Sequence, residues 1–160
     1  MTADPDPRQP ETSSLHFPRP GAGTVRVGVD TVHIPRIAES LSRHGERFMQ
    51  RLFTPAERAY AMAAPLHTAE RLAARFAAKE AVIKALSLSE VGVDWCDIEV
   101  MRDADGACTL SLHGRAAEQA RQLGVRELAL SLSHDGGQAI AMVVALRSPN
   151  TDPTRIRDHG

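Results

Sequence analysis

The sequence predicts an α+β protein, in which helices and antiparallel strands lie largely in separate parts of the chain. Capped helical segments fill most of residues 34–88, whereas short alternating runs separated by turn residues dominate residues 97–146. With 160 residues, of which 42% are hydrophobic, the chain can bury one sizeable core. We therefore expect a single domain.

The chain is predicted to begin its ordered part with a strand and a helix. Residues 24–30, TVRVGVD, alternate small and β-branched residues with little helix preference, so we expect a strand that ends at Asp30. Pro35 suits a first helical position and Gly45 suits a C-terminal cap. These two residues predict a helix over residues 34–45.

Two further helices follow. Thr54, Pro55 and Glu57 have the order and spacing of a capping box, which predicts that a helix starts there. No Gly or Pro interrupts residues 68–88, and this segment is predicted to form the longest helix.

The remaining elements are mainly strands. Residues 97–103 and 108–114 are predicted to pair as a β-hairpin around the turn ADGA. Residues 115–124 predict a helix closed by its terminal glycine. Two more strands are expected within residues 126–146, on either side of the turn HDGG.

Both ends of the chain differ from the domain in composition. Residues 1–23 and 148–160 are rich in Pro, Ser, Thr and Gly and poor in bulky aliphatic residues. Such segments contain too little apolar surface to offset the entropy lost on ordering. We predict a disordered N-terminal tail, a domain over residues 24–147 and a flexible C-terminal tail.

Charge and composition exclude several classes of partner. The formal net charge of −1 gives no overall field that would attract nucleic acid or anionic lipid. No apolar run approaches the roughly 18 residues that would span a membrane, and no secretory signal is recognisable. Cys96 and Cys108 stand alone, as small hydrophobic residues do in a reducing compartment. A cytoplasmic protein is expected.

The segment ARFAAKEAVIKAL, residues 74–86, places charged residues in a helix with scarcely any solvated face. Glu80 and Lys84 stand one turn apart, which is also the spacing of an ordinary surface ion pair. The alternative is that Glu80 is a metal ligand and Lys84 a phosphate contact. A buried carboxylate needs a cation or metal beside it in either case.

Asp30 is the second candidate carboxylate. Mg²⁺ prefers oxygen ligands, commonly one or two carboxylates completed by water and substrate phosphates, and Asp30 with Glu80 would form such a site. Asp30 could instead cap the helix that follows it.

A third group of polar residues occurs in SLSHDGG, residues 131–137. Ser133 and His134 could donate hydrogen bonds to an anion, or His134 could simply be solvated in a turn. A Ser-His-Asp triad with Asp135 is excluded, because adjacent residues on a strand point to opposite faces.

Five segments together resemble the holo-acyl-carrier-protein synthases, the small single-domain type of 4′-phosphopantetheinyl transferase. The resemblance covers roughly residues 25–146, and FAAKEAVIKA is its most specific part. The segments are VGVDTVHIPRI, LFTPAE, AARFAAKEAVIKAL, DIEV and LSLSHD.

This resemblance implies both a fold and a reaction. The fold would be that of the transferases, with an antiparallel sheet packed on a long central helix. The reaction would be Mg²⁺-dependent transfer of 4′-phosphopantetheine from coenzyme A to a serine of an apo acyl carrier protein, in fatty-acid or polyketide synthesis. Adenosine 3′,5′-bisphosphate would be released. Members of this length typically assemble as homotrimers with active sites between subunits.

The resemblance also assigns roles to residues. Asp30 and Glu80 would bind Mg²⁺, and Lys84 would approach the coenzyme A phosphates. The general base is left open between Glu80, acting through water, and Asp135. Relatives usually have a glycine-rich segment after KA, where this chain has LSLSEVGVDW. Ser87 and Ser89 are predicted to hold the nucleotide in its place, with Ser133 and His134 as further contacts.

The carrier is expected to be acidic, so a basic helix should bind it. Residues 34–51 contain several arginines at helical spacing, which could equally be a solvated helix surface. The resemblance favours docking by Arg36, Arg47 and Arg51. The alternative function is a non-catalytic oligomeric module that binds coenzyme A or a carrier protein.

Overall fold

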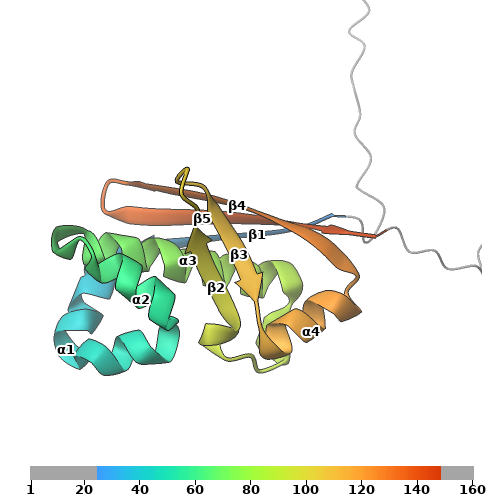
Figure 1. Ribbon diagram of the computed structural model, residues 1–160, viewed down its shortest axis with the longest axis horizontal. Coiled ribbons are helices and arrows are strands. Elements are labelled where there is room, and N and C mark those ends of the chain that lie inside the picture. Colours follow the sequence, from blue (N-terminus) through green and yellow to red (C-terminus); the bar gives the residue numbers. More distant parts are fainter. Residues whose placement is uncertain (1–24, 149–160) are drawn as a thin grey trace, which may run out of the picture.

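The computed structural model describes residues 25–148, and the predicted tails lie outside these residues except for Ser148. Figure 1 shows one sheet lying over a long helix, with the other helices at the two ends of that layer. The strands are β1 (Val25–His33), β2 (Ile98–Arg102), β3 (Cys108–Leu112), β4 (Val125–Asp135) and β5 (Gln138–Arg147). The α-helices are α1 (Ile34–Leu52), α2 (Pro55–Met62), α3 (Thr68–Leu86) and α4 (Gly114–Gln122). Three 3-10 turns complete the set, at Pro65–His67, Leu88–Glu90 and Trp95–Asp97.

The strands form two antiparallel sheets. The larger has the order β1–β5–β4, and β2 pairs with β3 in a separate hairpin. The central helix α3 lies against β1 and β5 and is buried along most of its length (Figure 1). The predicted α+β class, with an antiparallel sheet packed on a long helix, is confirmed.

Small residues allow α3 to approach β1 closely. Gly28 lies on the inner face of β1, and Ala81 and Ala85 face it from α3 with at most 1% of their surface exposed. A Cβ atom on Gly28 would lie 1.9 Å from the Ala81 carbonyl oxygen. The helix therefore packs directly on the backbone of β1.

A buried ion pair joins α3 to α2 and β2. Lys79 Nζ lies 2.8 Å from a carboxylate oxygen of Glu57, and neither side chain is exposed. The ammonium group also donates to the carbonyl oxygens of Trp95 and Ile98. Glu57 accepts from the backbone amides of Thr54 and Val100, so its role in the predicted capping box is confirmed. Every charge in this network is compensated, as burial requires.

One predicted boundary is wrong and another needs an addition. β1 does not end at Asp30 but continues to His33, because it pairs with β5 as far as Gln138. Asp30 is therefore mid-strand, and His33 rather than Asp30 precedes the helix. The predicted end of the first helical segment at Gly45 is confirmed, because Gly45 has a positive φ of 51° and interrupts α1. A second helical segment, which was not predicted, then extends α1 to Leu52.

The hairpin between β4 and β5 is tighter than the sequence suggests. Asp135 pairs with Gln138, which leaves only Gly136 and Gly137 in the turn. Both glycines have positive φ, 55° and 78°, as a two-residue hairpin turn requires.

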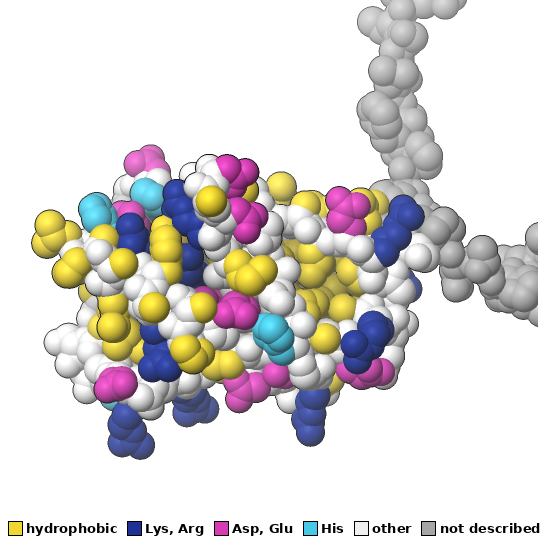
Figure 2. Space-filling view, viewed as in Figure 1, with side chains coloured by type: hydrophobic (Ala, Val, Ile, Leu, Met, Phe, Trp, Pro, Cys, Tyr) yellow, Lys and Arg dark blue, Asp and Glu magenta, His cyan; other side chains and the backbone are white. Residues whose placement is uncertain are grey.

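The outer face of the larger sheet, which points away from α3, is apolar and uncovered in the described chain. Its exposed hydrophobic residues are Val25, Val27, Val29, Ile140 and Met142, each with 40–55% of its surface accessible. A hollow of about 300 Å³, lined by both aliphatic and charged residues, lies between β3, α4 and β4, where Figure 2 shows hydrophobic side chains. None of the described helices is both long and apolar enough to cross a membrane.

Candidate functional site

A cluster of charged side chains lies where β1 meets α3. Lys84 Nζ is 2.6 Å from Asp30 Oδ1 and also donates to the carbonyl oxygen of Val29, at 3.1 Å. Glu80 stands one turn before Lys84 on α3. Asp30 and Lys84, which are 54 positions apart in the sequence, meet because the close contact at Gly28 brings β1 against α3.

The two carboxylates influence each other. Burial raises the pKa of Glu80 above its usual value, and the charge of Asp30 raises it further, while Lys84 opposes the shift. The hydrogen bond to Asp30 raises the pKa of the Lys84 ammonium group. Two carboxylates with one ammonium leave a net negative cluster. Because hard divalent cations take oxygen ligands of this kind, the donor set fits Mg²⁺.

A cavity of about 440 Å³ opens beside these carboxylates. Asp30, Glu80, His33 and Arg36 contribute its charged and titratable side chains. Apolar residues from β1, α1 and α3 form most of the remaining wall, together with two hydroxyl residues, Thr31 and Ser40; the apolar residues are Val32, Ile37, Phe48, Leu52 and Phe76. We refer to it as the carboxylate cavity. It offers a charged region and an apolar surface side by side.

The second half of α1 presents a basic surface. Arg43, His44, Arg47 and Arg51 line a hollow of about 520 Å³ around Phe48. Figure 2 shows Lys and Arg side chains projecting from the edge of the molecule where α1 lies. The predicted docking residues Arg47 and Arg51 lie here, whereas Arg36 lines the carboxylate cavity.

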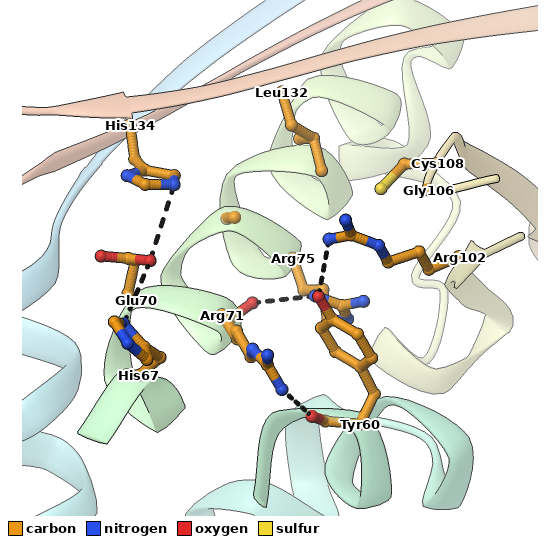
Figure 3. A pocket seen from close by; sticks show the side chains of 11 residues that line it. Tyr60, His67, Glu70, Arg71, Arg75, Arg102, Gly106, Cys108, Leu132 and His134 are labelled. Carbon is orange, nitrogen blue, oxygen red and sulfur yellow. Dashed lines mark hydrogen bonds and ion pairs between the residues drawn. The ribbon is translucent and has the colours of Figure 1, made fainter. Parts of the chain in front are cut away.

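A third cavity, of about 430 Å³, contains a concentration of arginines that the sequence interpretation did not identify (Figure 3). Arg71 and Arg75 stack on the ring of Tyr60, at 4.4 and 4.0 Å from its centroid. Arg102 approaches from the hairpin and donates to the Tyr60 hydroxyl at 2.8 Å. We call this the arginine cavity. Within the described chain, none of its three guanidinium groups forms an ion pair with a carboxylate.

Arg75 is the most informative of the three. Only 3% of its surface is exposed, and its Nε has no hydrogen-bond partner among the described residues. Burial lowers the pKa of its guanidinium group below the usual value, although Tyr60 and Glu57 act in the other direction. A buried cation without a bonded carboxylate favours binding of an anion.

His134 lies at the rim of the arginine cavity. Its Nε2 is 3.5 Å from Glu70 Oε1, and His67 approaches the same oxygen from the other side at 3.7 Å (Figure 3). Ser133 and Asp135 alternate with His134 on β4 and therefore point to the opposite, outer face of the sheet. In one protomer they cannot meet Asp30 and Glu80, which lie on the α3 side.

Ser87 and Ser89 follow the C-terminal end of α3, and both are exposed. Ser87 is the C-cap residue and accepts a hydrogen bond from Arg26 at 2.6 Å. The structure thus places Ser87 near Lys84, on the carboxylate side of the molecule. It brings neither serine to the arginine cavity.

The arginine cavity had a recognisable signal in the sequence. Arg71 and Arg75 stand one turn apart on α3, and no Asp or Glu occupies the positions three or four residues from either of them. An unpaired pair of cations in a largely apolar helix indicates an external anion. Tyr60 and Arg102 gave no such signal, since only the fold brings α2 and β2 to this point.

Comparisons with known proteins agree with the geometry. The family model described as 4′-phosphopantetheinyl transferase superfamily matches residues 26–143. The holo-[acyl-carrier-protein] synthase of Koribacter versatilis is 47% identical over 118 residues, which cover 73% of this chain and 94% of that protein. That of Anaeromyxobacter dehalogenans strain 2CP-1 is 50% identical over 121 residues, covering 74% and 92%.

Solved structures show the same similarity. The chain in the ACPS–CoA complex of Chronobacterium ammoniagenes is 40% identical, with a TM-score of 0.67 over 78% of this chain and 98% of that one. The Helicobacter pylori holo-[acyl-carrier-protein] synthase in complex with coenzyme A is 31% identical, with a TM-score of 0.63 over 74% and 98%.

Proposed function

Because the chain belongs to the 4′-phosphopantetheinyl transferase superfamily, as a holo-acyl-carrier-protein synthase, we propose that its carboxylate and arginine cavities bind opposite ends of coenzyme A. The enzyme transfers 4′-phosphopantetheine from coenzyme A to an apo acyl carrier protein. The observation that carries the assignment of the reacting end is the cluster of Asp30, Glu80 and Lys84 beside an open cavity.

Asp30 and Glu80 would hold Mg²⁺ at this cluster. The ion would supply positive charge to the phosphoryl oxygens of the diphosphate as it is cleaved. Lys84 adds a second positive charge from α3, and its exposed ammonium group can turn from Asp30 to a phosphate oxygen. The apolar wall of the carboxylate cavity would limit access of water to the diphosphate.

The attacking serine must lose a proton as its oxygen bonds to phosphorus and the bond to the leaving phosphate breaks. Glu80 lies in the cluster beside the open cavity, where its carboxylate would accept the proton through a water molecule. Asp135 points to the other face of the sheet, so it could act only on a site in a neighbouring subunit. We assign the proton to Glu80.

The arginine cavity would bind the 3′-phosphate end of coenzyme A. Arg75 supplies a buried unpaired donor, while Arg71 and Arg102 complete a cationic wall. His134, at the rim, would donate to the same anion after its Nε2 turns away from Glu70. Guanidinium groups suit this task because they bind phosphate oxygens through two parallel hydrogen bonds.

We further propose a homotrimer with active sites between subunits. The two cavities share no lining residue within one protomer. The outer face of the sheet exposes five large hydrophobic residues, which a second copy of the chain would cover. Contact between subunits would also bring Ser133 and Asp135 of one copy towards the site of another.

The acyl carrier protein would dock on α1. Arg43, Arg47 and Arg51 form a basic surface around Phe48, and Phe48 also lines the carboxylate cavity. An acidic carrier bound there would lie beside the reacting cluster. Charge reversal on this helix should therefore weaken carrier binding without changing the affinity for coenzyme A.

Two experiments test the proposal. The first incubates the protein with apo carrier, coenzyme A and Mg²⁺ and detects the phosphopantetheine adduct by mass spectrometry. We expect an adduct with the native chain and none with Glu80→Gln, while both should have similar circular dichroism. Near-normal turnover by Glu80→Gln would remove Glu80 from the catalytic site. A native chain that binds coenzyme A but modifies no carrier would favour the binding module.

The second experiment tests the interface. Glu80→Gln and Arg75→Met are each expected to be inactive alone, because each destroys one cavity. Co-expressed with different affinity tags, they should form mixed oligomers in which some interfaces combine two intact cavities. Recovery of activity in the doubly purified protein is expected. Its absence in stable mixed trimers would show that each site lies within one subunit.

A further inference from the structure

Arg26 joins β1 to the C-terminal end of α3, beside the reacting cluster. Its side chain lies on the same face of β1 as Gly28 and Asp30, towards the helix. Its Nε donates to the carbonyl oxygen of Ala85, and its Nη2 donates to the Ser87 hydroxyl at 2.6 Å. One guanidinium group therefore contacts both the last turn of α3 and the residue that caps it.

The end of α3 is an unfavourable place for an anion. Carbonyl groups left without partners give a helix C-terminus a partial negative charge, which repels phosphate. Lys84 lies in this last turn, and the proposed function places a diphosphate next to it. Arg26 brings a positive charge to one of these carbonyl groups and so reduces the repulsion where the diphosphate would bind.

The cap residue itself is strained. Ser87 has φ 54° and ψ 44°, and it is the only non-glycine residue with positive φ among residues 25–148. Glycine is the usual residue in this conformation, because a Cβ atom is disfavoured there. The hydrogen bond from Arg26 to the Ser87 hydroxyl holds the serine in place, and with it the chain that leaves the last turn.

We propose that Arg26 is a positioning residue for coenzyme A binding: it neutralises the end of α3 and fixes Ser87, so that Lys84 and the capping turn can accept the diphosphate. This inference rests on the proposed function and adds to it a residue that touches neither substrate. Its effect should fall on the affinity for coenzyme A rather than on the carrier protein.

The test compares steady-state kinetics of three variants in the full chain with Mg²⁺. Arg26→Met removes the charge and both hydrogen bonds, whereas Arg26→Lys keeps the charge but cannot donate at both points. The matched control is Arg147→Met, because Arg147 Nε donates in the same way to the carbonyl oxygen of Leu123, the residue that caps α4. Arg147 lies at the end of β5 and lines none of the three cavities described above.

We expect the KM for coenzyme A to rise about tenfold in Arg26→Met, because this variant loses both the charge at the helix terminus and the charged hydrogen bonds. In Arg26→Lys, which keeps the charge, the KM should rise about threefold. The KM for the carrier should stay within about twofold of the native value. Arg147→Met should lower the Tm without changing either KM. If Arg26→Met fails to fold, the proposal is tested by Arg26→Lys alone, whose KM for coenzyme A should rise about threefold.

Two outcomes would overturn the inference. One is an unchanged KM for coenzyme A in Arg26→Met accompanied by a Tm loss like that of Arg147→Met, which would make Arg26 a purely structural cap. The other is an equal rise in both KM values. Failure of the native chain to form the adduct is a separate result, seen before any variant is compared, and it would overturn the proposed function itself.

Discussion

Gly28→Ala provides the sharpest test of how the fold positions the reacting cluster. The added Cβ would lie 1.9 Å from the carbonyl oxygen of Ala81 and 2.8 Å from the amide nitrogen of Ala85. Both are backbone atoms in the C-terminal part of α3, so neither can rotate away as a side chain could. The strand and the helix must separate.

The size of the effect follows from these distances. Cβ contacts shorter than 3.0 Å are essentially never observed, so the Ala81 contact must lengthen by at least 1.1 Å, the difference between 3.0 and 1.9 Å. Overpacking of this kind typically lowers the free energy of unfolding by about 1–3 kcal/mol. Asp30 lies two residues along the same strand and bonds Lys84 across the same gap. A displacement of about 1 Å at a catalytic cluster can cost about 100-fold in rate.

Urea denaturation and the adduct assay measure the two effects separately. We expect Gly28→Ala to lower the unfolding free energy by about 1–3 kcal/mol and kcat/KM by about 100-fold. Thr109→Val, at an exposed position of β3, should change neither quantity appreciably. A stable Gly28→Ala variant with native kcat/KM would refute the claim that direct packing of α3 on β1 sets the cluster.

Three further predictions concern the scaffold and the interface. Glu57→Gln should lower the unfolding free energy in urea by about 3–5 kcal/mol, because it leaves the buried Lys79 ammonium group without its charge partner; a loss below about 1 kcal/mol would contradict this role. The pKa of Glu99 is lowered in the folded protein, mainly by the hydrogen bond from Thr54. Ionised Glu99 therefore stabilises the fold above its usual pKa of 4.5, and this stabilisation is lost as the pH falls through the lowered pKa of the folded state. Urea titrations at about pH 6 and pH 3 should therefore show that acid lowers the unfolding free energy less in Glu99→Gln than in the native chain. An equal decrease in both proteins would mean that other groups cause the acid sensitivity. Val29→Asp on the outer face of the sheet should convert the proposed homotrimer to monomers in sedimentation velocity, because it would bury a charge at the proposed interface; an intact trimer would place the interface on another surface.

Much of the fold could be predicted because its signals are local. The capping box at Thr54 and the uninterrupted helix of residues 68–86 depend on neighbours within a few positions. The boundary at Asp30 was wrong for the opposite reason, because pairing with β5 extends β1 beyond the aspartate. Gly45 ends a first helical segment, as its local signal predicts, and α1 then continues to Leu52.

Some residues of the candidate site could likewise be recognised from local sequence, whereas others are brought together only by the fold. Glu80 and Lys84 were evident from the sequence, because one helical turn separates them and an apolar helix makes their charges conspicuous. Asp30 needed the fold to join them across 54 positions. Tyr60 and Arg102 could not be found in advance, since their meeting with Arg75 depends on how α2 and β2 pack around α3.

The sequence by itself determined the helices, most of the strands and the residue types that suit phosphoryl transfer, since these depend on periodicity and on chemistry within one or two turns. The tertiary structure alone decided which charges face one another. It placed the carboxylates and the arginines in two separate cavities and left the outer face of the sheet open to a second copy. Such contacts join distant parts of the chain through packing, and no local pattern records them.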